Sequence, residues 1–413
     1  MAKTKPQNGS TKSRNRKKGA PNSSSKKPAP SPSTLLAQAA DLIQQGQPTD
    51  ALTLAQRALS ILQPTSTPTL AALPALNLLG EINVELGDIQ SARDCFTRAA
   101  ELDPEGGVPE AAGGGAEKFL WLAQLSEKGG VESVGWFEKG VAVLRREIAG
   151  LVGEIGQGGK MQDAGGLLGG KMELLEEKRR KLAHALCGVA EIYMTDLSWE
   201  EDAEQRCEAL VTEALLVAPD SPEPLQTLAS IRISQEKPED ARAALSRSIE
   251  LWKDLDPADP KVPDFPTRIS LARLLMEAEM EEEALEVLER LITEDDSSVE
   301  AWYLGGWCLH LLGGKRNTAS SSSQTARDAP SDEGDTVRAL LKASREWLQN
   351  SLRLYQVLEY EDERLRDHAL ELVKELDGVL GPATEDDEDE DGGDWEDADG
   401  ADDDEEDEEM RGA

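Results

Sequence analysis

The stretch that decides the fold is residues 79–104, LGEINVELGDIQSARDCFTRAAELDP. Small residues stand at Gly80 and Ala92, Gly87 lies between them, and the large Phe96 follows four residues after Ala92. Apolar residues recur at helical spacing on both sides of Gly87. Because two helices approach closely where both carry small residues, this spacing predicts a pair of antiparallel helices joined by a short turn.

The same spacing recurs along the chain, which indicates an internal repeat. Ala272 and Gly306, which hold equivalent positions in two neighbouring copies, are 34 residues apart. The repeated small positions are Gly80 and Ala92, Ala229 and Ala241, Ala272 and Ala284, and Gly306, with weaker copies at Gly46 and Ala51 and at Gly188 and Ala214. One helix pair cannot bury both of its apolar faces, so successive pairs are expected to stack.

These residues resemble the tetratricopeptide repeat, with six or seven helical pairs over residues 33–381. The resemblance implies an all-α fold, a tetratricopeptide-repeat superhelix (α-solenoid). The composition agrees, because aromatic residues make up only 4% of the chain and alternating β-branched stretches are missing. A generic helical solenoid with the same spacing by chance is the alternative.

Several segments stand apart from this helical pattern. Residues 1–32 form a basic arm of Lys, Arg, Ser and Pro, and residues 382–413 form an acidic tail. Both are expected to be disordered, because they offer little apolar surface to bury. Residues 150–170 and 313–335 are rich in Gly or Ser, and residues 254–266 carry four prolines. All three read as loops inserted in the array.

Charge narrows the class of partner. The formal net charge is −37, of which the tail, with 19 acidic residues and Arg411, contributes −18 and the first 30 residues contribute +9. Residues 31–384 therefore keep −28 in their own right. A protein that binds nucleic acid or an anionic membrane needs positive charge on its binding surface. The repeat body is negative, so it is expected to bind neither directly. A basic protein is the expected ligand.

Residues that carry chemistry are scarce. The three histidines, His184, His310 and His368, are far from one another, and none of them forms one of the usual metal-ligand motifs with a cysteine. No nucleophile elbow, phosphate-binding Gly loop or catalytic Cys/His signature occurs. We therefore expect no enzyme activity, no catalytic residue, no metal and no cofactor.

A binding surface remains. The resemblance to tetratricopeptide arrays implies that the first helix of each pair lines a concave groove. Projected onto this sequence, the groove residues are Asn77, Glu81, Glu85, Tyr193, Glu223, Gln226, Glu277, Glu300, Tyr303, Trp307 and His310. Carboxylates dominate this set, and Tyr303 and Trp307 are expected to serve as aromatic anchors, a residue type enriched at interface centres.

A narrower resemblance comes from three segments, residues 118–126 (KFLWLAQLS), 136–138 (WFE) and 190–202 (AEIYMTDLSWEED). Together with the basic arm and acidic tail, they resemble the fungal assembly chaperones dedicated to ribosomal protein uL4. That resemblance implies a non-catalytic chaperone that binds and shields newly made uL4 and delivers it to the pre-60S ribosomal subunit. The alternatives are a histone-binding acidic chaperone and a tetratricopeptide adaptor subunit of a larger complex.

The basic arm bears on localisation. Lys12, Arg14, Arg16, Lys17 and Lys18 form a candidate nuclear-localisation patch, which would place the protein in both cytoplasm and nucleus. A disordered arm that increases solubility, or that makes transient contacts with RNA, is an equally good interpretation of the same residues.

Overall fold

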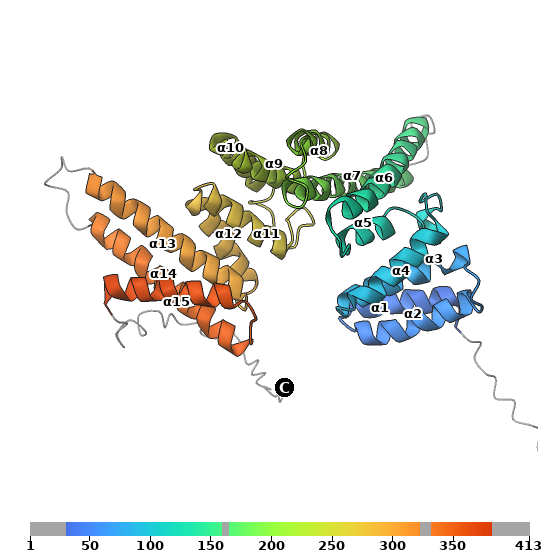
Figure 1. The fold of residues 1–413 in the computed structure, drawn as a ribbon, viewed down its shortest axis with the longest axis horizontal. Helices are drawn as coiled ribbons and strands as arrows, with labels where there is room; N and C mark the ends of the chain where they lie inside the picture. Colours follow the sequence, from blue (N-terminus) through green and yellow to red (C-terminus); the bar gives the residue numbers. More distant parts are fainter. Residues whose placement is uncertain (1–29, 159–164, 323–331, 382–413) are drawn as a thin grey trace, which may run out of the picture. The chain divides into compact units, whose positions relative to one another are not determined.

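The computed structural model describes residues 30–158, 165–322 and 332–381. Within these ranges the regular structure is helical (Figure 1). In chain order the helices are α1 (Pro32–Gln44), α2 (Pro48–Leu62), the 3₁₀ turn η1 (Leu70–Ala72), α3 (Leu73–Glu85), α4 (Ile89–Leu102), the 3₁₀ turn η2 (Glu110–Ala112), α5 (Glu117–Gln124), α6 (Gly130–Gly158), α7 (Gly165–Met194), α8 (Ala203–Val217), α9 (Pro222–Ser234), α10 (Pro238–Glu250), α11 (Phe265–Glu277), α12 (Glu281–Glu294), α13 (Val299–Ser322), α14 (Asp332–Val357) and α15 (Glu363–Leu380). The predicted all-α class is confirmed.

The chain divides into two compact units, Met1–Trp121 and Leu122–Ala413, called here the N-terminal and C-terminal units. In the N-terminal unit α1 packs on α2, α2 on α3 and α3 on α4. In the C-terminal unit each helix from α7 to α15 packs on a sequence neighbour, and α7, α9, α11, α13 and α15 also contact one another in that order. This second set of contacts builds a continuous inner row of helices.

The turns inside the helix pairs share one backbone feature. Gly46 and Gly87 have φ angles of +70° and +73°, a conformation that glycine adopts without strain. Glu236 and Glu279 stand at the equivalent place in two later pairs and also have positive φ. The turn geometry therefore repeats even where glycine does not.

The small residues of the repeat lie where helices touch, as the spacing predicted. A Cβ added at Gly80 would come within 2.4 Å of the Phe96 ring. One added at Gly306 would lie 2.7 Å from Cγ of Leu348, which is fully buried. Because neighbouring atoms already occupy this space, any side chain larger than hydrogen would push the helices apart.

The predicted loops at 150–170 and 313–335 are wrong over most of their length. Helix α6 continues to Gly158 and α7 starts at Gly165, while α13 continues to Ser322 and α14 starts at Asp332. Isolated glycines cost a helix only about 1 kcal/mol each. Here each pair of long helices packs antiparallel, and that packing offsets the cost. Residues 159–164 and 323–331, like residues 1–29 of the basic arm and the acidic tail, lie outside the described residues, whereas Pro32 at the end of the arm already belongs to α1.

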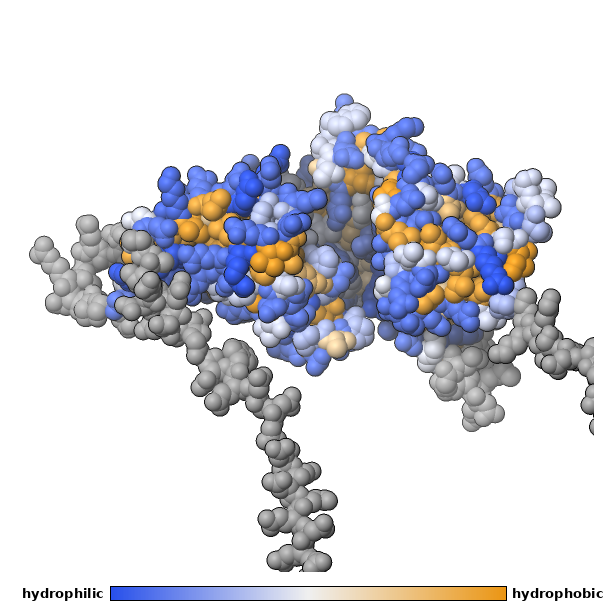
Figure 2. All heavy atoms as spheres, turned by 90° about the horizontal axis from the view of Figure 1, so that it is seen from below, coloured by the Kyte–Doolittle hydropathy of each residue, from blue (hydrophilic) through white to orange (hydrophobic). Residues whose placement is uncertain are grey.

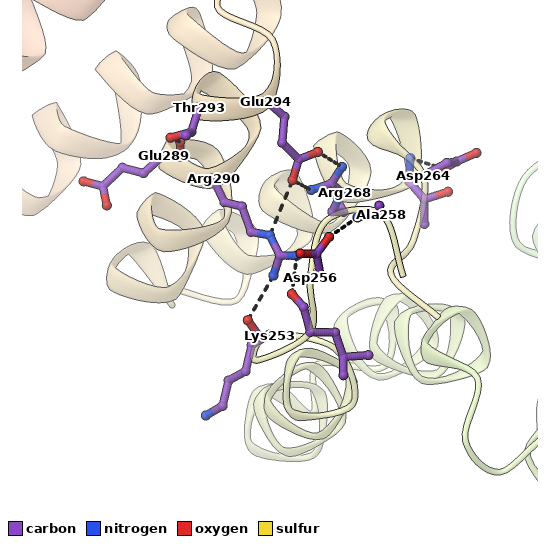
Figure 3. A network of polar contacts seen from close by, with 11 residues as sticks. Lys253, Asp256, Ala258, Asp264, Arg268, Glu289, Arg290, Thr293 and Glu294 are labelled. Carbon is purple, nitrogen blue, oxygen red and sulfur yellow. Dashed lines mark hydrogen bonds and ion pairs between the residues drawn. The ribbon is translucent and has the colours of Figure 1, made fainter. Parts of the chain in front are cut away.

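The proline-rich stretch 254–266, by contrast, is a loop as predicted up to Asp264, where α11 begins at the next residue, and a polar network fastens it to α12 (Figure 3). Arg290 donates to the carbonyl oxygens of Lys253 and Leu255, at 2.9 and 2.8 Å. Glu294 accepts from Arg290 and, at 2.5 and 2.7 Å, from Arg268 at the start of α11. These contacts fix α11 against α12, and α11 is the middle helix of the inner row.

Candidate functional site

The inner row of the C-terminal unit carries the larger of two neighbouring cavities, with a volume of about 940 Å³. Side chains from α5, α6, α7, α9 and α11 line it. Glu191 comes from α7, Glu223 and Gln226 from α9, and Arg273 and Glu277 from α11. Charged and amide side chains from three successive inner helices therefore face one space.

The smaller cavity, of about 760 Å³, lies between α11, α13 and α15. Arg273 and Glu277 line this cavity as well as the larger one, so the two adjoin along α11. We call the combined surface the inner groove. All of its lining residues lie within 123–368, inside the C-terminal unit.

Acidic groups outnumber basic ones in the inner groove. Its carboxylates are Glu191, Asp196, Glu223, Glu277 and Asp362, and its guanidinium groups are Arg273 and Arg364. Two of these carboxylates already serve the fold, since Asp196 accepts from the Gly130 N–H at 2.9 Å and Asp362 caps α15. Arg273 forms an ion pair with Glu300. Glu191, Glu223 and Glu277 have no ion-pair partner among the described residues, although Glu223 accepts a hydrogen bond from the Ser221 hydroxyl, and their charge remains to attract a cation.

The environment of Glu191 supports this electrostatic picture. Desolvation by nearby protein atoms raises the pKa of Glu191, although its side chain remains exposed to solvent, and the charge of His184 acts in the opposite direction. A carboxylate with a raised pKa is held in a setting that disfavours its charge. An incoming ligand cation relieves that cost, so binding at this position favours the ionised form.

Five of the predicted groove residues line the cavities: Glu223, Gln226, Glu277, Tyr303 and Trp307. Glu300 stands at the edge through its ion pair with Arg273. His310 is half-buried on α13, with Nε2 3.8 Å from a carboxylate oxygen of Glu375, and does not line the groove.

Tyr193 is wrong as a groove residue. Its side chain is only 5% exposed and faces α6 and α8, where Arg206 donates to its hydroxyl at 2.6 Å. Its neighbours Glu191 and Ile192 face the groove instead. The prediction fails here because groove positions were numbered from the first residue of each repeat. Helix α7 has 30 residues and is longer than a repeat helix, so this numbering does not identify its inward face.

Asn77, Glu81 and Glu85 lie on α3 in the N-terminal unit, apart from the cavities just described. Asn77 is half-buried and its amide donates to the Gly113 carbonyl at 2.9 Å, which holds the segment after α4 in place. Glu81 is partly buried and Glu85 is exposed. The structure thus assigns Asn77 a structural contact within the N-terminal unit, and none of the three is among the lining residues of the inner groove.

Tyr303 and Trp307 lie in the groove but not as protruding anchors. Tyr303 is 9% exposed, and its hydroxyl is 2.7 Å from Nδ1 of His368 on α15. The Trp307 ring meets the same imidazole edge to face, with centroids 5.0 Å apart. These rings therefore form the wall of a cavity, which receives a side chain rather than supplying one.

Some groove residues escaped the sequence analysis. Glu191 was missed because of the register error on α7. Asp362, Arg364 and His368 belong to α15 or its cap, which carries no repeat signature, although α15 closes one side of the smaller cavity. The heptad-like spacing of Leu365, Leu372 and the other buried residues of α15 was the one available signal.

The described residues show neither a membrane-spanning helix nor a cluster of metal ligands. Among the described residues, none of the helices combines the length and the apolar character needed to span a membrane. In the same part of the chain, no three His, Cys, Asp or Glu side chains gather as metal ligands would. The candidate nuclear-localisation residues Lys12–Lys18 lie outside the described residues.

The surface gives no single large apolar face in the view of Figure 2. Hydrophilic residues cover much of the visible surface, and apolar residues gather in separate clusters between them. On this face, therefore, the view shows no large apolar patch of the kind that marks many protein-binding surfaces.

Comparison with known proteins gives consistent results. Residues 31–105 match the profile of the tetratricopeptide repeat family. A protein of Emericella nidulans named "Probable assembly chaperone of rpl4" is 54% identical over 361 residues, which cover 86% of this chain and 84% of the relative. A protein of Schizosaccharomyces pombe with the same name is 32% identical over 315 residues, covering 76% and 83%.

A solved structure is also similar. It is described as residues 1–338 of an assembly chaperone of RpL4, and it is 52% identical to this chain with a TM-score of 0.63. The match covers 70% of this chain and 99% of the solved one. Sequence and fold comparisons therefore converge on the same group of proteins.

Proposed function

This chain belongs to the family of rpl4 assembly chaperones, and from that premise we propose that it binds and shields newly made rpl4, the ribosomal protein uL4, until that protein joins the pre-60S subunit. The protein acts as a holder rather than a catalyst. Its work consists of capture, protection and release.

The observation that carries this proposal is the inner groove, in which Glu191, Glu223 and Glu277 project from three successive helices without an ion-pair partner among the described residues. A ribosomal protein has Lys- and Arg-rich segments that remain unneutralised until rRNA arrives. Carboxylates held on a stacked helical scaffold can take the place of the phosphates, because the scaffold fixes their spacing before the ligand binds.

The acid excess also supports selectivity. A surface of this sign repels nucleic acid and anionic membranes, so the repeat body binds neither. The acidic tail adds weak, screened contacts that act only within about 8 Å at physiological ionic strength. Pre-ribosomal RNA carries a denser array of charge, and its competition for the same basic segments drives release.

Delivery to a nuclear particle requires the protein to enter the nucleus. We infer that the chain shuttles between cytoplasm and nucleus, with Lys12, Arg14, Arg16, Lys17 and Lys18 as the basic signal. The cluster combines five bases in seven residues with no acidic residue among them. A carrier could therefore read it as a short cationic motif.

Affinity purification of the tagged full-length chain across a salt series tests the proposal. We expect near-stoichiometric rpl4 at low salt and a steep loss as added salt shortens the Debye length from about 10 Å at 0.1 M to about 3 Å at 1 M. Core histones in place of rpl4 would favour a histone chaperone. A fixed set of subunits without rpl4 would favour an adaptor, and either result would overturn the proposal.

A further inference from the structure

We propose that the smaller cavity, between α11, α13 and α15, is a receptor for one large apolar side chain of the bound ribosomal protein. The inference rests on the proposed function and adds a specificity site to it. The larger cavity then selects positive charge, and the smaller one selects an apolar residue a few positions along the same segment.

Part of the wall of the smaller cavity is apolar and belongs to the core. Met276, Leu304 and Leu365 come from three different helices and are at most 9% exposed, so their positions are fixed by the core. Leu311 is half-buried and the Trp307 ring stands beside it. An apolar side chain that enters this space exchanges water for aliphatic and aromatic contacts, and such burial stabilises a complex by about 1.5–3 kcal/mol per large side chain.

The polar groups at the cavity do not call for a charged ligand. The Tyr303 hydroxyl is already bonded to His368. Two guanidinium groups, from Arg273 and Arg364, balance the two carboxylates Glu277 and Asp362. The lining of the smaller cavity thus carries no net formal charge from these groups, whereas in the larger cavity Glu191 and Glu223 add to the shared Glu277, so a lysine or arginine side chain gains more there.

Geometry links the two cavities into one recognition surface. Arg273 and Glu277 line both, so a segment that lies along α11 passes from one to the other. At about 760 Å³ the smaller cavity is in the usual range for ligand pockets and exceeds the volume of one side chain. It therefore accommodates a side chain together with the backbone that flanks it.

Filling the cavity tests the inference. The variant Leu311→Trp places an indole among the walls, and Leu370→Trp places the same group on an exposed position of α15 as the matched control. In titrations of the full-length chain with purified rpl4, we expect Leu311→Trp to weaken binding at least 10-fold in both low and high salt. Leu370→Trp should bind as the wild type does.

An alanine scan of rpl4 completes the test. Alanine substitutions at the apolar residues of rpl4 should reveal one position that costs about 10-fold with the wild-type chain and almost nothing with Leu311→Trp, which is the signature of direct coupling. If Leu311→Trp fails to fold, the scan against the wild-type chain decides alone. Uniformly small effects, or full binding by a folded Leu311→Trp variant, would overturn the receptor. No binding of rpl4 to the wild-type chain would instead overturn the proposed function.

Discussion

Neutralising the inner groove is expected to weaken rpl4 binding about 100-fold, or about 3 kcal/mol. The triple variant Glu191→Gln, Glu223→Gln and Glu277→Gln keeps the shape of the groove and removes its three carboxylates without ion-pair partners. Each partly screened charge pair with a ligand cation contributes about 1 kcal/mol, and the three act together on one segment. Isothermal titration of the full-length chain with rpl4 at constant ionic strength measures the effect.

The control removes the same charge from the outside of the array. Glu250→Gln, Glu286→Gln and Glu289→Gln change three exposed carboxylates on α10 and α12, helices that do not line the inner groove. This variant should bind within about threefold of the wild type. Equal losses in both triple variants would mean that net charge alone, and not the groove, holds the ligand.

The raised pKa of Glu191 gives the same interaction a pH dependence. As pH falls toward that raised value, Glu191 takes up a proton and its contribution to binding a cation is lost. The wild-type chain should therefore lose affinity on mild acidification before an ordinary glutamate would titrate. In the triple variant, which lacks Glu191, this part of the pH dependence should be absent.

Replacing Lys118 by methionine is expected to destabilise the N-terminal unit by about 3–5 kcal/mol. Lys118 is 1% exposed, and its ammonium donates to Asp103 and to the Gly115 carbonyl, both at 2.9 Å. Asp103 also accepts from the N–H groups of Gly107 and Val108. Removal of the cation leaves a buried carboxylate without its charge partner. Hydrogen exchange of α3 and α4 in urea isolates the effect on this unit.

The pH dependence of this pair has a definite sign. Burial by itself raises the pKa of Asp103, but the hydrogen bond and charge of Lys118 and the two N–H groups lower it overall. Its stabilising contribution is therefore present above the unfolded value of about 3.9 and is lost as pH falls through the lower folded value. The difference in the free energy of unfolding between the wild type and Lys118→Met should shrink in acid.

The matched control Arg98→Met, at an exposed position of α4, should change stability little. A Lys118→Met variant as stable as the wild type at neutral pH would contradict the role of the pair.

The sequence alone predicted the helical pairs because their spacing is a direct packing requirement. Gly80 and Gly306 are small for the reason proposed, since Phe96 and Leu348 occupy the adjacent space. The glycine-rich stretch 150–170 was wrongly predicted to be a loop, because glycine lowers helix propensity only modestly. The packing of α6 on α7, which keeps the segment helical, joins residues too far apart in sequence to be recognised from local composition.

The groove could be predicted only where the repeat register holds. Glu223, Gln226 and Glu277 lie on helices of ordinary repeat length, and they line the larger cavity as projected. Tyr193 lies on the long α7, where the register drifts. The role of Tyr303 depends on His368, 65 residues later in the chain, so sequence reasoning could identify an aromatic residue but not the wall it forms.

Hydrogen exchange of the full-length chain with and without rpl4 tests the central claim, that the inner groove holds the ligand, most directly. Helix faces that line the groove on α7, α9, α11 and α13 should gain protection, while the exposed faces of α8, α10 and α12 should exchange as in the free protein. Protection confined to those outer helices, or to the N-terminal unit, would contradict the account.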